Sequence, residues 1–272
     1  MNSFIPADPL AELLKALDLT GVDDKSSNED LFIGPSQWMP HGRVFGGQVL
    51  AQCLVAAERT IPDDRPAHSL HGYFLRAGDI DLPITFSVDR LRDGRSFSTR
   101  RVQAFQKGEA IFSMIASFQT RDAGLDHQDN FPTDIPDPET LPSAAELIGE
   151  SSHPVAQYWS KARPFDMRYP TSPLYFKVEG EHVAHQAVWL RAIGQLPDDA
   201  ALQPCRDPVR AGEVLGADGA GQAEHAGHGQ RREQHVVGET AISEQRGRQA
   251  HRPRQEMRDQ GAANGAGQIQ GN

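Results

Sequence analysis

The stretch from residue 43 to 119 most constrains what this 272-residue chain can fold into. Near its start lies Gly46-Gly47. The apolar residues that follow these glycines at helical spacing predict a helix that ends before Pro62. Four strand-like runs separated by glycine-containing turns follow, at 68–75, 84–88, 96–106 and 111–119. In the last run, alternate apolar residues from Phe112 to Phe118 occupy one face. One helix packed on about five antiparallel strands is a complete small α+β unit.

Two shorter elements are predicted ahead of this unit. Asp8 is suited to cap a helix that has Pro9 in its first turn and an apolar stripe from Leu10 to Leu17. Gly21 can end that helix. Residues 22–30 are polar and predict a loop, and 31–33 a short strand.

The amino-acid composition of the rest of the chain divides it into three further segments. After a first domain at 1–120, residues 121–164 are rich in proline and acidic residues, which indicates a linker with one helix near 144–150. Strand-like runs return within 165–203, at 165–169 and 186–192, and predict the start of a second unit of the first type. Residues 204–272 are mostly Gly, Ala, Gln, Arg, His and Glu without a helical or strand period, so we expect a disordered tail.

Composition narrows the classes of function. A formal net charge of −10 argues against general nucleic-acid binding, which needs a basic surface. No apolar run reaches the length of about 18 residues that a membrane span needs. The first residues lack the basic and apolar regions of a signal peptide, and two cysteines form no disulfide framework. These features favour a cytoplasmic protein with a buried thiol at Cys53.

Two features could bind a ligand. At Gly46-Gly47-Gln48, backbone N–H groups at a helix start could bind a carbonyl oxygen or a phosphate, or the glycines could simply let helix and sheet approach closely. The hairpin sequence around Asp93-Gly94 carries five arginines, among them Arg92 and Arg95, which could hold a phosphorylated ligand. A solvated charged surface is the commoner explanation for such a cluster.

Other motifs argue against a metal site, a nucleotide cofactor and a serine hydrolase of the α/β-hydrolase type. His68 and His71 lie three apart on a predicted strand, so their side chains should point to opposite faces, and His182 and His185 have no ligand partner at suitable spacing. Neither a Gly-x-Ser-x-Gly elbow nor a P-loop nor a dinucleotide fingerprint occurs.

Four motifs taken together resemble the acyl-CoA thioesterase II (TesB) family. They are Arg43-Val44-Phe45-Gly46-Gly47-Gln48, His68-Ser69-Leu70-His71-Gly72-Tyr73-Phe74-Leu75-Arg76, Arg92-Asp93-Gly94-Arg95-Ser96-Phe97 and Ile115-Ala116-Ser117-Phe118-Gln119. The resemblance extends more loosely to Leu196-Pro197-Asp198-Asp199 and covers residues from about 8 to 203, where it ends at Gln203.

This resemblance implies a double hotdog fold, in which each half is a helix wrapped by a curved antiparallel sheet. Here it implies one complete hotdog and an incomplete second one. It also implies hydrolysis of fatty acyl-CoA to free fatty acid and CoA without a cofactor.

The resemblance also bears on the catalytic residues. In the family an Asp, a Thr or Ser and a Gln orient the attacking water, at positions that follow Pro197-Asp198-Asp199. These positions fall in the part that is missing here after Gln203, and no residue matches them. Asp207 and Asp218 lie in aperiodic sequence, so no catalytic residue is assigned.

The substrate-binding candidates are Gly46, Gly47, Gln48, His68, Arg92 and Arg95. The thioesterase assignment has two alternatives: an inactive remnant or acyl-CoA-binding protein, and another hotdog enzyme such as an enoyl-CoA hydratase, whose Asp–His pair is not evident. An incomplete second unit would leave Trp189 and Leu190 uncovered, which predicts self-association into homo-oligomers or poor solubility.

Overall fold

The computed structural model describes residues 5–23, 29–121, 135–170 and 185–197, together with two short strands at 223–224 and 236–241. In chain order the elements are α1 (Pro9–Leu17), β1 (Thr20–Val22), β2 (Asp30–Gly34), α2 (Gly46–Glu58), β3 (Ala67–Phe74), β4 (Ile84–Asp93), β5 (Phe97–Gln106), β6 (Glu109–Gln119), the 3-10 turn η1 (Pro138–Thr140), α3 (Ala144–Ile148), α4 (Pro154–Lys161), β7 (Phe165–Arg168), β8 (His185–Ala192), β9 (Ala223–Glu224) and β10 (Val236–Ala241).

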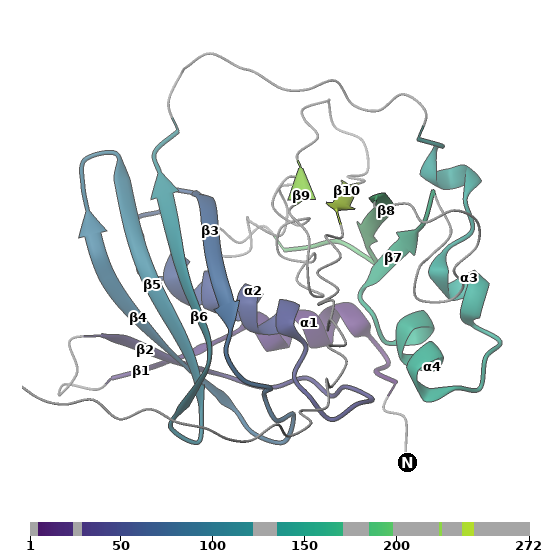
Figure 1. Ribbon diagram of the computed structural model, residues 1–272, viewed down its shortest axis with the longest axis horizontal. Helices are drawn as coiled ribbons and strands as arrows, with labels where there is room; N and C mark the ends of the chain where they lie inside the picture. The colour runs from purple at the N-terminus through teal and green to yellow at the C-terminus, as the bar shows by residue number, and fades with distance from the viewer. Residues whose placement is uncertain are drawn as a thin grey trace, which may run out of the picture.

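A twisted six-stranded antiparallel sheet packs against α2 and forms the first unit (Figure 1). The strand order is β1-β2-β4-β5-β6-β3, so β3 occupies one edge and pairs with β6 alone. This arrangement of one helix and one antiparallel sheet confirms the predicted α+β hotdog unit.

The core of this unit lies between α2 and the inner face of the sheet. Cys53, Ala56 and Ala57 of α2 are fully buried, as are the alternate sheet residues from Phe112 to Phe118. The predicted period of two in the last strand is therefore confirmed. Burial raises the pKa of the Cys53 thiol well above its usual value, which keeps this thiol protonated and unreactive.

Two glutamines tie α2 to the segments that precede it. Gln48 Nε2 donates to the Pro35 carbonyl at 2.9 Å and to Gln52 Oε1 at 3.1 Å. Gln52 Nε2 in turn donates to the carbonyls of Ala16 and Pro35, at 2.8 and 2.9 Å. These buried amides satisfy backbone carbonyls inside the core and fix the position of the first turn of α2.

The N-terminal helix begins as predicted and ends earlier. Asp8 accepts hydrogen bonds from the N–H groups of Leu10 and Ala11, as expected of an N-cap. α1 ends at Leu17, and Gly21 belongs to β1, which extends the sheet. The apolar stripe stops at Leu17, so no further helical turn would bury apolar surface.

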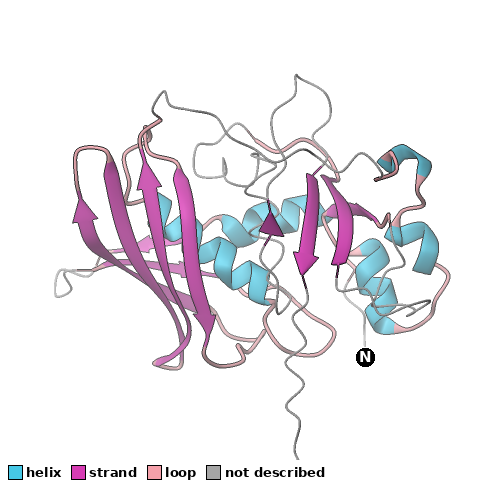
Figure 2. Cartoon of the chain, turned by 45° about the horizontal axis from the view of Figure 1, so that its top comes forward, coloured by secondary structure: helices cyan, strands magenta, loops and turns pink. Residues whose placement is uncertain are grey.

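A second, smaller sheet has the order β7-β8-β10-β9. In both views α1 and α2 lie between the two sheets, and α3 and α4 lie beyond β7 (Figures 1 and 2). The helix predicted near 144–150 is α3. α4 lies inside the expected linker and was not predicted.

The expectation of a disordered tail differs from the structure at β9 and β10. Residues 236–241 pair antiparallel with β8. They contain two adjacent valines and a threonine, which favour a strand, but the run is too short to give a clear period. The other residues of 204–272 lie outside the described part.

The predicted exposure of Leu190 is wrong, whereas Trp189 is half-buried. β10 pairs with the edge of β8, Leu190 is buried, and Trp189 Nε1 donates to the Pro136 carbonyl at 3.1 Å. Among the helices of the described residues, none is long and apolar enough to cross a membrane.

Candidate functional site at the N-terminus of the central helix

The N-terminus of α2 presents backbone donors. Phe45 is the N-cap residue and makes no side-chain cap, while its carbonyl accepts from both Gln48 N and Val49 N. Among the described residues, no hydrogen bond uses the N–H of Gly46 or Gly47. Such N–H groups carry the positive end of the helix dipole and suit an oxygen with negative charge.

The turn before α2 is held against the segment that follows β3. Val44 N donates to the Gly78 carbonyl at 3.0 Å, and Arg43 forms a β-bridge with Asp79. A Cβ at position 78 would lie 3.0 Å from Val44 Cγ2, so glycine permits this close approach. This contact fixes the position of the turn that precedes Gly46.

A cavity of about 420 Å³ opens beside this turn. The turn contributes Arg43, Val44 and Gly46, and the end of β3 and its continuation contribute Phe74, Leu75 and Arg76. His41 also lines it. Apolar residues complete its lining, but we call this space the polar cavity, because Arg43, Arg76 and His41 are all among the residues that line it.

The two arginines of the polar cavity differ in their pairing. Arg76 forms an ion pair with Glu109 at 2.9 Å and donates to the Ala110 carbonyl at 2.8 Å. Arg43 is exposed, and its guanidinium has no ion-pair partner among the described residues. Arg43 is therefore the cation at this cavity that is available to an anionic ligand.

A second cavity, of about 340 Å³, adjoins the same turn and α4. Met39, Phe45, Val155, Tyr158 and Trp159 line it, with Arg163 and again His41 at its boundary. We call it the aromatic cavity. The Arg163 guanidinium lies 3.3 Å from the Trp159 ring centroid and 5.5 Å from that of Phe45, so it joins α4 to the turn.

Gln48 follows Gly46 and Gly47 in the first turn of α2, but its side chain makes hydrogen bonds within the core. Its Oε1 accepts from Gln37 N at 3.1 Å, and its Nε2 makes the two bonds to Pro35 and Gln52 described above. The amide is thus occupied inside the core, and its direct binding to substrate stays a prediction.

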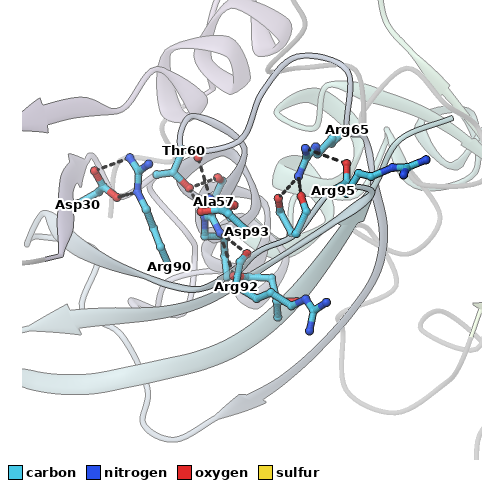
Figure 3. Close-up of polar contacts among 12 residues, drawn as sticks. Asp30, Ala57, Thr60, Arg65, Arg90, Arg92, Asp93 and Arg95 are labelled. Atoms are coloured by element: carbon cyan, nitrogen blue, oxygen red, sulfur yellow. Dashed lines mark hydrogen bonds and ion pairs between the residues drawn. The ribbon is translucent and has the colours of Figure 1, made fainter.

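Most arginines of the hairpin between β4 and β5 are engaged with neighbours (Figure 3). Arg90 holds Asp30 through two bonds of 2.7 and 3.0 Å, and Arg101 pairs with Asp89 at 2.7 Å. The guanidinium groups of Arg92 and Arg95 are exposed and point away from this network in Figure 3. These two remain candidates for an anion.

Arg100 is the buried member of this cluster, with 1% of its surface exposed. Its Nε donates to Thr60 Oγ1, and its terminal nitrogens donate to the carbonyls of Thr60, Arg92 and Thr99 and to Asp93. Five donors therefore meet five acceptors, and the end of α2 is fixed to the hairpin.

Asp93 shows the effect of this network on a carboxyl group. Burial alone would raise its pKa, but hydrogen bonds from Arg100 and Ser98, together with the charges of Arg100 and Arg90, outweigh burial and lower the pKa.

His68 lies on the outer face of the sheet. Its Nε2 lies 3.0 Å from Ser117 Oγ, and its ring meets Phe97 edge-on at 5.9 Å. A β-bulge between Ala67 and Ser69 shifts the register here, so His68 and His71 share the outer face instead of pointing to opposite faces.

The site candidates thus fall at opposite ends of α2. Gly46, Gly47 and Gln48 are at its N-terminus, while Arg92 approaches its C-terminus through Arg100 and Thr60. A 13-residue helix at about 1.5 Å per residue separates the two ends by about 20 Å. His68 and Arg95 lie toward the hairpin end as well, so these residues do not converge on one small site.

Sequence reasoning missed His41 and the α4 side of the site. One signal was available: His153-Pro154 resembles a helix start, and Val155, Tyr158 and Trp159 follow at helical spacing.

The expected end of the family resemblance falls on residues that the structure does not describe. Gln203 lies outside the described residues, as do Asp198, Asp199, Asp207 and Asp218. The expectation that the family's catalytic Asp, Thr and Gln positions are missing after Gln203 therefore stays a prediction from the sequence. It is neither confirmed nor contradicted by the described part of the chain.

Comparison with known proteins identifies the family of this chain. The acyl-CoA thioesterase N-terminal domain family matches residues 34–119, which contain α2 and strands β3 to β6. Acyl-CoA thioesterase 2 of Haemophilus influenzae is 36% identical over 206 residues, covering 73% of this chain and 68% of that protein. The chain belongs to the acyl-CoA thioesterase II family.

Other members of this family match over a similar share of their length. Human acyl-coenzyme A thioesterase 8 is 36% identical over 73% of this chain, and the match spans 65% of the human protein. The crystal structure of acyl-CoA thioesterase II TesB2 from Mycobacterium marinum superposes with a TM-score of 0.54 at 39% identity, covering 71% of this chain and 65% of that one. This thioesterase-family chain thus spans about two thirds of the length of the relatives it matches.

Proposed function

We propose that this acyl-CoA thioesterase II family member binds acyl-CoA at the N-terminus of α2 and hydrolyses the thioester to free acid and CoA. The observation that carries the proposal is the pair of N–H groups at Gly46 and Gly47, which have no partner among the described residues and lie beside a cavity with an available arginine. The relatives named acyl-CoA thioesterase support the substrate class.

The chemistry follows from this arrangement. The helix N–H groups would polarise the thioester carbonyl and stabilise negative charge on its oxygen as water adds to the carbonyl carbon. The carbon–sulfur bond then breaks and CoA leaves as the thiol. Arg43 would attract the phosphates of CoA. By resemblance, the groups that orient water follow Asp199, outside the described residues.

One observation favours a second candidate function, acyl-CoA binding without turnover. Neither cavity has an Asp or Glu among its described lining residues. His41 Nδ1 accepts a hydrogen bond from Arg43 N at 3.3 Å, so in the neutral ring its Nε2 carries the proton. With Nδ1 occupied by this hydrogen bond, His41 has no free acceptor nitrogen in the neutral ring with which to act as the base.

Thiol release from a series of acyl-CoAs by the purified full-length chain separates the two. An intact relative serves as positive control, and isothermal titration with the same ligands reports binding. The proposal predicts both binding and release above the uncatalysed rate. Binding without release would establish the second function, and absence of binding by a folded chain would refute both.

We also infer that the chain self-associates through β3. This strand is the sheet edge, and Tyr73, Phe74 and Leu75 at its end are 64%, 50% and 49% exposed. An open edge with exposed apolar side chains favours pairing with another chain. Analytical ultracentrifugation over a range of concentrations should show reversible dimers that Tyr73→Lys weakens. A monodisperse monomer at every concentration would exclude this inference.

For the compartment, we propose the cytoplasm, supported by the free cysteine Cys53, because cytoplasmic proteins keep their thiols reduced. Fractionation of the source cells with an antibody would test it, and recovery outside the cytoplasm would refute it.

A further inference from the structure

The aromatic cavity, lined by the turn 39–45 and α4, differs from the polar cavity in its aromatic lining. Met39, Phe45, Val155, Tyr158 and Trp159 present apolar or aromatic surface to it. The charged group at its boundary, Arg163, is stacked over the Trp159 ring. A space of about 340 Å³ with this lining suits an apolar ligand group.

The two cavities adjoin the same donors. His41 lines both of them. Phe45 lines the aromatic cavity, and the next residue, Gly46, lines the polar cavity and begins α2. A carbonyl oxygen held by the first N–H groups of α2 would therefore lie near both the aromatic cavity and the cavity that Arg43 and Arg76 line.

An acyl-CoA molecule likewise has an apolar part and an anionic part on either side of its thioester. Its CoA part carries phosphate groups, its acyl part is a hydrocarbon chain, and the thioester carbonyl lies between them. We propose that the aromatic cavity receives the acyl chain, and that Val155 and Trp159 of α4 determine how long a chain fits. This inference rests on the proposed function, because it assumes that the thioester lies at Gly46.

α4 is well placed for this role. Besides the Arg163 contacts, Tyr158 packs against Trp38 with ring centroids 6.2 Å apart. The helix is therefore fixed to the first unit by aromatic contacts at two points, although it belongs to the predicted linker segment. Val155 is 39% exposed, so its substitution should not disturb the core.

Isothermal titration of the full-length chain with CoA and with saturated acyl-CoAs of increasing length tests the inference. In the wild type, affinity should rise about fourfold per methylene until the cavity is full, the gain expected for a buried methylene. Val155→Trp, which fills the cavity, should abolish most of this rise and leave the affinity for CoA itself unchanged. Trp159→Ala, which enlarges it, should move the best-bound chain to a greater length.

Lys161→Ala is the matched control, because Lys161 is exposed at the end of α4 and does not line the cavity. It should bind every ligand like the wild type, and thermal melting should show that all variants fold. If CoA binds but the affinity does not depend on chain length, this inference alone is overturned. The same holds if Val155→Trp leaves that dependence unchanged. Failure of CoA and every acyl-CoA to bind would overturn it together with the proposed function.

Discussion

At the scale of single residues, the arginine cluster shows why one sequence motif can hold several roles. Arg100 and Arg101 are adjacent, yet one is fully buried and the other pairs with Asp89 at the surface. Successive residues of a strand point to opposite faces, so Arg100 faces the core and Arg101 the solvent. Sequence alone identified the cluster, but which arginine is buried depends on the register of β4 and β5.

The buried position of Arg100 predicts a large difference between two matched substitutions. Arg100→Lys keeps the charge but loses the planar fork, and it should lower the free energy of unfolding by about 3 kcal/mol, as for a broken buried charged network. Arg101→Lys should change it by less than about 1 kcal/mol, as for an exposed pair. Urea denaturation of both variants measures this, and equal effects would show that the Arg100 network does not stabilise the fold.

The lowered pKa of Asp93 predicts a pH dependence of stability. A carboxyl with a folded-state pKa below its unfolded value of about 3.9 stabilises the fold above that value, and this contribution is lost as pH falls through the folded-state pKa. Asp93→Asn keeps a favourable turn sequence before Gly94.

This variant should lose less than about 1 kcal/mol at pH 7, because the side chain of Asp93 is 49% exposed. The difference from the wild type should shrink as pH falls below about 4. Thermal melting between pH 3 and 7 measures it, and a difference that stays constant or grows toward acid pH would contradict the assigned cause.

At the scale of elements, α2 separates two groups of cations. Its N-terminus lies beside Arg43 and Arg76, and its C-terminus is fixed to the hairpin that carries Arg92 and Arg95. Since about 20 Å separates the ends of a helix of this length, one phosphate cannot contact both groups.

We therefore expect the two ends to respond differently to charge removal. Arg43→Gln should weaken CoA binding at least tenfold, because a hydrogen bond to a charged group contributes about 1.5–3 kcal/mol. Arg92→Gln, also exposed, should change it less than about threefold, as for a charge outside the site. Titration with CoA measures both, and a larger loss for Arg92→Gln would move the phosphate site to the hairpin.

The elements of the first unit were largely predictable, because period and turn residues agree there. The alternation from Phe112 to Phe118 and the glycine turns located β6 and its neighbours. The bulge at His68 could not be predicted, since it depends on the pairing of β3 with β6. α4 was not predicted, because it lies in a proline-rich segment whose composition suggested a linker.

At the scale of the whole molecule, the candidate site joins segments that are distant in sequence. The turn 39–46, the end of β3 and helix α4 meet around the first turn of α2. Sequence motifs located the glycines, but the aromatic cavity depends on packing between the first unit and α4. Family membership could be inferred from sequence because the four motifs all fall inside the first unit.

The most direct test of the account compares kcat/KM for acyl-CoA hydrolysis, followed by thiol release, in the wild type, Gly46→Pro and Gly46→Ala. Proline is well tolerated at the first helical position and removes one N–H, whereas alanine keeps that N–H and controls for added bulk. We expect Gly46→Pro to lose about a hundredfold, as for one oxyanion donor, and Gly46→Ala to stay within about tenfold of the wild type. Equal rates in the two variants, or no thiol release by the folded wild type, would contradict catalysis at the N-terminus of α2.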